Sequence, residues 1–334
     1  MPWPNDRGEL TLTYPASAVA VGSQDNPALG VLSLVAGVSV FSVQDVIIKL
    51  ISGAYPVYEA ITIRSLVALP LLLALVALNG GLATLASKRM PLLLLRGVIM
   101  FVSYTVYYLA LASLPLATCV ALYFVAPLFI TVLSAAALGE RIDAARWAAV
   151  ATGFAGVLLI VRPGSDIFDP AAVLPVAAGL AYAVSQILAR KLGNDQSASV
   201  MTFYANAMYI VGGVALALIF GDGSHAAEQN KSLAFLVRGW TTPNPTDLLL
   251  MVSCGIIAAA GLTLLSQAYR SAKASTVAPF EYTVILLSVA YGWFIWAEWP
   301  DPVSWIGIIV VIGSGLYVLY RERVSPRPEE VSPA

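Results

Sequence analysis

The chain has 334 residues, of which 59% are hydrophobic and only 11% are charged, and its formal net charge is −1. Soluble domains usually carry about 25% charged residues, so this composition excludes an ordinary soluble protein and indicates an integral membrane protein. The near-neutral charge argues against nucleic acid as a partner, and the two cysteines and one histidine suggest neither a disulfide framework nor a metal or cofactor site.

Ten segments are long and apolar enough to cross a membrane, because a spanning helix needs about 20 mostly apolar residues. In chain order they cover residues 30–51, 58–79, 91–112, 116–138, 145–162, 171–190, 198–220, 246–270, 275–297 and 302–320. Turn residues such as Gly, Pro, Asn and Asp lie in the breaks between them. The polar ends, residues 1–28 and 322–334, are predicted to be disordered cytoplasmic tails, and the first contains no signal peptide.

The distribution of Lys and Arg predicts the orientation of the ten spans. If the N-terminus lies in the cytoplasm, twelve of the 18 Lys and Arg residues fall in cytoplasmic segments and four in external segments, while Arg64 and Arg96 fall within spans. We therefore expect a multi-pass protein of the bacterial cytoplasmic (inner) membrane with both termini in the cytoplasm. The sequence leaves open whether the protein is a monomer or a homodimer.

The two halves of the chain, residues 29–164 and 165–321, resemble each other. Residues 31–50 and 173–192 match at seven positions with a constant offset of 142, and these positions include a Gln and a Lys that apolar composition alone does not explain. Later in the chain the offset becomes 158. Spans one to five are therefore repeated as spans six to ten.

Because each half has five spans, the second half must enter the membrane from the opposite side. Lys49 then ends its helix outside, whereas its counterpart Lys191 ends its helix inside, and Glu140 corresponds to Glu298. The predicted fold is an all-α integral membrane protein with ten transmembrane helices in two inverted five-helix repeats. This architecture is typical of secondary transporters, whose site lies between the repeats.

Other classes of protein fit the sequence less well. The spans contain no H-E-x-x-H, P-loop, metal-ligand spacing or Ser/His pair, so an enzyme is not expected. No nucleotide-binding domain is present in the sequence, which argues against direct ATP drive. A channel would not need inverted repeats, and saturable flux into vesicles would exclude a receptor or assembly factor built on a transporter fold.

The stretch ALASLPLATCVALYFVAPLFITVLSAAALGERIDAARWAAVATGFAGVLLIVRPG, residues 110–164, closely resembles the EamA-type domain of the drug/metabolite transporter superfamily. The matching features are ASLPLA, the AP near mid-span, LGER, and the Arg-Trp and Gly pattern that ends in RPG. The second copy is more divergent. The resemblance implies ten helices around a central cavity that binds amino acids, vitamins, nucleosides or related metabolites, but it does not fix the substrate.

Charged residues inside the spans are candidates for function, because each costs about 2.5–3.5 kcal/mol on insertion scales. Asp45 and Arg64 lie at one level on consecutive spans, roughly 9 Å below the external boundary, and Lys49 lies almost at that boundary. One interpretation is structural: Lys49 reaches the interface and Arg64 pairs with Asp45. The other is that Lys49 or Arg64 meets an anionic group of the substrate at the external mouth.

Glu281 lies in the ninth span, roughly 9 Å from the inner face, and corresponds in the repeat to Tyr123. A carboxylate at this depth could exchange protons or bind a cationic amine, so Glu281 is the candidate for proton coupling. The alternative is that it stays protonated and forms hydrogen bonds to Tyr or Ser. Arg96 lies nearer the inner face, where it can extend to the interface, and a structural role is favoured for it.

Neutral polar residues complete the predicted site. The substrate-binding candidates are Asp45, Lys49, Arg64, Tyr104, Tyr107, Tyr123, Gln186, Gln267 and Glu281, with Gln44, Tyr108 and Asn206 as further hydrogen-bonding groups. Together they would suit an amphipathic substrate with an apolar or aromatic body and a charged head. We expect a secondary transporter of such a metabolite, an amino acid or a drug-like compound, that exports it by alternating access, with either a proton gradient or the substrate gradient itself as the energy source. Uptake of a vitamin, nucleoside-like cofactor or organic anion is the alternative.

Overall fold

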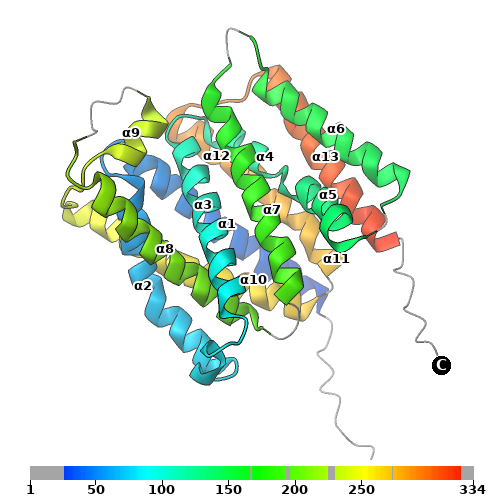
Figure 1. Ribbon diagram of the computed structural model, residues 1–334. Helices are drawn as coiled ribbons and strands as arrows, with labels where there is room; N and C mark the ends of the chain where they lie inside the picture. Colours follow the sequence, from blue (N-terminus) through cyan, green and yellow to red (C-terminus); the bar gives the residue numbers. More distant parts are fainter. Residues whose placement is uncertain are drawn as a thin grey trace, which may run out of the picture.

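The computed structural model describes residues 26–140, 142–165, 168–192, 196–224, 230–272 and 274–324. Its α-helices are α1 (Pro27–Ile51), α2 (Val57–Leu78), α3 (Met90–Leu111), α4 (Leu116–Tyr123), α5 (Ala126–Leu138), α6 (Ala144–Val161), α7 (Val173–Leu192), α8 (Ala198–Phe220), α9 (Lys231–Val237), α10 (Pro245–Ser271), α11 (Ala274–Val277), α12 (Thr283–Trp296) and α13 (Pro302–Val324). Short 3-10 helices cover Leu82–Leu85, Pro170–Ala172 and Ala278–Tyr282. Figure 1 shows these helices packed as one bundle.

Ten helical segments are long and apolar enough to span a membrane, which confirms the predicted fold class. Helix is the expected form, because hydrocarbon offers no hydrogen-bond partner for the backbone. Side chains cap several helix starts, such as Asn26 on α1, Asp143 on α6 and Ser197 on α8. Most of the two predicted tails, residues 1–25 and 325–334, lies outside the described residues.

Two of the ten spans are interrupted, which the sequence analysis did not predict. The fourth span consists of α4 and α5, with Pro127 just after the break, and the ninth consists of α11, a 3-10 turn that contains Pro279, and α12. Proline lacks the N–H that would bond to the carbonyl four residues earlier, so each proline weakens the helix at that point. Tyr123 and Glu281, which correspond in the repeat, both lie at these interruptions.

The helices pair according to a pseudo-twofold axis between the repeats. Helix α1 of the first repeat packs against α10 of the second, and their counterparts α7 and α3 also pack against each other. Helix α2 packs against its own counterpart α8, and α6 against its counterpart α13. We call the end of the bundle where α1 begins and α13 ends the terminal face, and the opposite end the far face.

Glycines allow α6 and α13 to approach closely at one edge of the bundle (Figure 1). A Cβ atom on Gly307 would lie 2.8 Å from the backbone oxygen of Gly156 and 2.6 Å from Ile160. A Cβ on Gly313, on the same helix, would meet no atom within 4 Å. The contact between these helices therefore depends on the lack of a side chain at Gly307.

The variants Gly307→Ala and Gly313→Ala test this contact. Both gain the same helix propensity, so their difference isolates packing. We expect Gly307→Ala to destabilise the protein by about 1–3 kcal/mol, because the added methyl group overpacks the seam, while Gly313→Ala leaves stability unchanged or higher. Melting temperatures of the purified proteins in detergent measure this, and equal values for the two variants would contradict the packing argument.

Candidate functional site

A cavity of about 500 Å³ lies between the two repeats. Residues of α1, α2, α3 and the α4–α5 break line it from the first repeat, and residues of α7, α8, α10, the 3-10 turn at 278–282 and α12 line it from the second. Helices α6 and α13 contribute no lining residue among those described. The volume falls within the range of pockets that bind small molecules.

The structure brings most of the predicted site residues together. Seven of the nine line the cavity: Asp45, Arg64, Tyr104, Tyr107, Tyr123, Gln186 and Glu281. The other two do not. Lys49 lies at the far face in an ion pair, and Gln267 is exposed and donates a hydrogen bond to Ser271.

Tyrosines form the polar network on one wall of the cavity. Gln44 on α1 donates to the hydroxyl groups of Tyr108 at 2.7 Å and Tyr104 at 3.2 Å, and its own oxygen has no partner. Tyr107 donates to Asp45 Oδ2 at 2.9 Å, and its ring lies 4.9 Å from that of Tyr123 between centroids. These hydroxyls and rings give the cavity both aromatic faces and hydrogen-bonding groups.

Arg64 does not pair with Asp45, contrary to the structural interpretation of these two charges. Among the described residues no acidic group lies within salt-bridge distance of Arg64, whose side chain instead packs on Tyr104 and Tyr209, with Cζ 4.4 and 5.6 Å from the ring centroids. Lys49 does not pair with Asp45 either. Its partner comes from the other repeat.

A buried ion pair closes the bundle at the far face. Lys49 Nζ lies 2.7 and 2.8 Å from the two carboxylate oxygens of Glu298 and donates a further hydrogen bond to the Leu114 carbonyl at 2.7 Å. The N–H of Leu116, which begins α4, donates to Glu298 as well. The Lys49 side chain is only 9% exposed, and Nζ lies 4.9 Å from the ring centroid of Trp296. This cluster joins α1 and α4 to the end of α12.

A tight turn after α12 positions Glu298. Ala297 adopts a left-handed conformation, with φ at 56°, and the N–H of Glu298 bonds to the carbonyl of Gly292. Asp301 anchors the other end of the turn through Arg162 and Ser304. Although burial opposes ionisation, these hydrogen bonds hold the pKa of Asp301 below its ordinary value.

The terminal face has a similar but more exposed ion pair, in which Glu140 is the repeat counterpart of Glu298. Glu140 follows Gly139, which is left-handed with φ at 69°. The N–H of Glu140 bonds to the carbonyl of Ser134, six residues earlier, just as the N–H of Glu298 bonds to that of Gly292. Arg190, beside Lys191 at the end of α7, lies 3.1 Å from Glu140. The two side chains are 38% and 42% exposed, compared with 9% and 26% for Lys49 and Glu298. The structure is thus more firmly closed at the far face.

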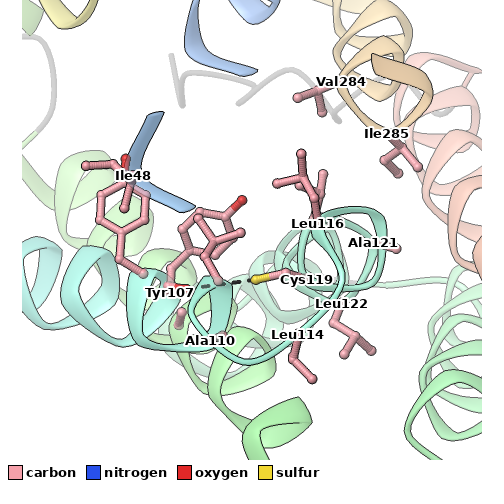
Figure 2. Close-up of a cluster of buried hydrophobic side chains, with 14 of the residues drawn as sticks. Ile48, Tyr107, Ala110, Leu114, Leu116, Cys119, Ala121, Leu122, Val284 and Ile285 are labelled. Atoms are coloured by element: carbon pink, nitrogen blue, oxygen red, sulfur yellow. Dashed lines mark hydrogen bonds between the residues drawn. The ribbon is translucent and has the colours of Figure 1, made fainter. Parts of the chain in front are cut away.

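An apolar layer separates the far-face ion pair from the cavity. Along α4, Leu116 contacts Glu298 through its N–H, Cys119 is completely buried, and Val120 lines the cavity. Figure 2 shows Leu116 and Cys119 among other buried side chains, with the Cys119 thiol donating to the Tyr107 carbonyl at 3.8 Å. Water entering from the far face would have to cross both the ion pair and this layer.

The sequence analysis missed three residues near the site. Tyr182 and Tyr209 line the cavity, and Glu298 binds Lys49. Helical spacing could have found the tyrosines, because they lie four residues before Gln186 and three after Asn206. The repeat could have found Glu298, since Lys49 and Glu298 correspond to Lys191 and Glu140 at the other face.

The ten spans, their inverted pairing and the cavity between the repeats define a membrane protein of the ten-helix carrier class. A model of the EamA-like transporter family matches residues 28–162 and, in a second copy, residues 170–320. The chain therefore belongs to the EamA-like transporter family, and this confirms the resemblance seen in the sequence. It is a multi-pass membrane protein of a family of transporters rather than enzymes.

Similar proteins are named as transporters of small metabolites. The S-adenosylmethionine uptake transporter of Rickettsia conorii is 27% identical over 84% of this chain and 89% of its own length. The riboflavin transporter of Vibrio cholerae is 30% identical over 63% of this chain and 64% of its own, and the pseudopaline exporter CntI of Pseudomonas aeruginosa PAO1 is 28% identical over 85% and 93%. A crystal structure that aligns with 91% of this chain and all of its own, with a TM-score of 0.58 and 18% identity, shares the fold.

The difference in burial between the two ion pairs gives a stability prediction. Lys49→Met leaves the partly buried Glu298 without its cation, so we expect a loss of about 2 kcal/mol, between the values for exposed and buried pairs. Arg190→Met, at the exposed pair, should cost less than about 1 kcal/mol. Thermal unfolding in detergent measures both. The double variant Lys49→Met/Glu298→Met should recover part of the loss, and strictly additive effects would exclude the coupling.

Proposed function

We propose that the protein is a secondary transporter that moves a small amphipathic metabolite by alternating access of the central cavity. The observation that carries this proposal is that each face has one ion pair joining the two repeats, built on the corresponding residues Glu298 and Glu140, and that the first pair is largely buried while the second is exposed. A cavity with a closed far face and a weaker closure at the terminal face is what one state of such a carrier requires.

The repeat suggests how the second state forms. Because the halves are related by inversion, the contacts of one face can be exchanged for those of the other. In the second state Glu140 would be buried against Arg190 or Lys191, as Glu298 now is against Lys49, and the Lys49–Glu298 pair would open. The left-handed turns at Gly139 and Ala297 hold both carboxylates ready for this exchange.

The lining supports a substrate with a flat unsaturated ring. Tyr104, Tyr107, Tyr123, Tyr182 and Tyr209 present rings and hydroxyl groups to the cavity. The substrates named for the similar proteins include S-adenosylmethionine and riboflavin, both of which contain such rings. Asp45, Arg64, Gln186 and Glu281 would bind the polar groups, and Glu281 is our candidate for proton coupling.

Flux into and out of proteoliposomes tests this function. We expect saturable movement of a ring-bearing metabolite, with labelled riboflavin, S-adenosylmethionine and aromatic amino acids as the first probes. Loss of flux in Glu281→Gln together with loss of its dependence on an imposed pH gradient would support proton coupling. Export stays our prediction for the direction of transport, and both termini stay predicted to lie in the cytoplasm of a bacterium. The same vesicles measure the direction of transport. If every probe moves no faster in vesicles that contain the protein than in vesicles without it, a transport function is contradicted.

The two native cysteines allow a test of the far-face closure. In a Cys254→Ser background, Cys119 is the one remaining thiol, and the apolar layer should protect it from a water-soluble methanethiosulfonate. Lys49→Gln should raise its modification rate about tenfold, which corresponds to a shift of about 1.4 kcal/mol toward the far-open state. The matched variant Arg190→Gln weakens the pair at the other face and should not raise the rate. Equal rates in the Lys49 and Arg190 variants would refute this role for the Lys49–Glu298 pair.

A further inference from the structure

Arg64 is the most deeply buried of the cations that line the cavity. Its side chain enters from α2, the residue is 6% exposed, and its Nε and Nη1 atoms are buried with no hydrogen-bond partner among the described residues. Arg96, the other cavity-lining arginine, is half-buried and has a hydrogen bond from Nη1 to the Met201 carbonyl. The Nε atom of Arg96 is also buried without a partner, but of these two arginines only Arg64 makes no hydrogen bond to any described residue.

The guanidinium of Arg64 remains charged in this position, because arginine does not deprotonate in proteins. Buried charges are normally paired with an opposite charge, and a buried N–H normally has an acceptor. The rings of Tyr104 and Tyr209 stabilise the cation, but they do not supply the oxygen acceptors that its N–H groups lack. Asp45 could have served as the partner, yet it accepts from Tyr107 instead.

We propose that Arg64 binds an anionic oxygen group of the transported metabolite, a carboxylate or a phosphate. The planar guanidinium presents parallel N–H donors that match two oxygens of either group. An anion in the cavity would give the Arg64 guanidinium the acceptor that no described residue supplies. Tyr104 and Tyr209, whose rings are stacked with centroids 5.1 Å apart, both pack on the Arg64 side chain.

This inference rests on the proposed transport function and narrows its substrate class. It predicts a metabolite in which the anionic group lies close to a flat ring, because the same tyrosines that pack on Arg64 line the cavity. Asp45, on the neighbouring helix and also in the lining, would then face a neutral or cationic part of the same molecule. A purely neutral or purely cationic compound would leave the arginine unpaired.

Matched pairs of compounds that differ only in the anionic group test the proposal by binding. The probes are nicotinate with nicotinamide and phenylalanine with phenylalaninamide for a carboxylate, and adenosine 5′-monophosphate with adenosine for a phosphate. We expect the member that carries the carboxylate or phosphate to raise the melting temperature of the detergent-purified protein, while the partner that lacks this group does not. Arg64→Gln should weaken binding of that anion at least about tenfold, and Arg64→Lys should retain part of it because it keeps the charge but not the planar donors.

Lys88→Gln provides the matched control, since it removes one positive charge at an exposed position outside the cavity. It should bind the anion as the wild type does. Binding that is unchanged in Arg64→Gln, or equal stabilisation by the neutral partner, would overturn the proposal. If an anion binds through Arg64 but no probe moves in vesicles, transport is refuted and the anion site stands. If neutral compounds are transported and Arg64→Gln does not change their flux, the transport function is supported and the proposed anion site is refuted.

If no probe binds, the melting temperature of the ligand-free protein tests the proposal. A cation kept unpaired for a ligand destabilises the empty protein, so the melting temperature of Arg64→Gln should equal or exceed that of the wild type. If Arg64→Gln lowers the melting temperature clearly more than Lys88→Gln does, Arg64 serves in packing and the proposal is overturned.

Discussion

The ion pair between Lys49 and Glu298 joins the two halves of the molecule at the far face, and we propose that the closure of the cavity depends on it. Two charges this close to hydrocarbon are stable together only because each has several partners. The Leu114 carbonyl and the Leu116 N–H supply these partners at the start of α4. The pair therefore fixes α1, α4 and the end of α12 as one unit, and the apolar layer beneath it packs against that unit.

Most of the fold could be predicted from the sequence, because length and hydropathy constrain a helix in a bilayer strongly. The interruptions of the fourth and ninth spans could not. Proline is well tolerated in the first turn of a helix, so the Ala126-Pro127 pair is compatible with a break and with a continuous kinked helix. Tertiary contacts decide between them: the glycine at 179 lets α7 approach the Tyr123 carbonyl that the break exposes.

The site was predictable where the helical face was clear and not where a partner came from the other repeat. On α10, Ala258, Leu262 and Leu265 line the cavity at helical spacing, so Gln267, about 200° further round the helix, points away. The charge of Lys49 was visible in the sequence, but its partner is 249 residues away. Arg64 and Asp45 both line the cavity, yet a common predicted depth does not determine which neighbour each side chain contacts.

The glycine seam between α6 and α13 has a consequence for movement. These two helices join the repeats but line no part of the cavity among the described residues, so a substrate can reach either face without separating them. Residues near a rotation axis move least when two bodies rock against each other. The seam is thus suited to be the hinge axis of the molecule, and distances measured across it should stay constant while those between Lys49 and Glu298, and between Glu140 and Arg190, change in opposite directions.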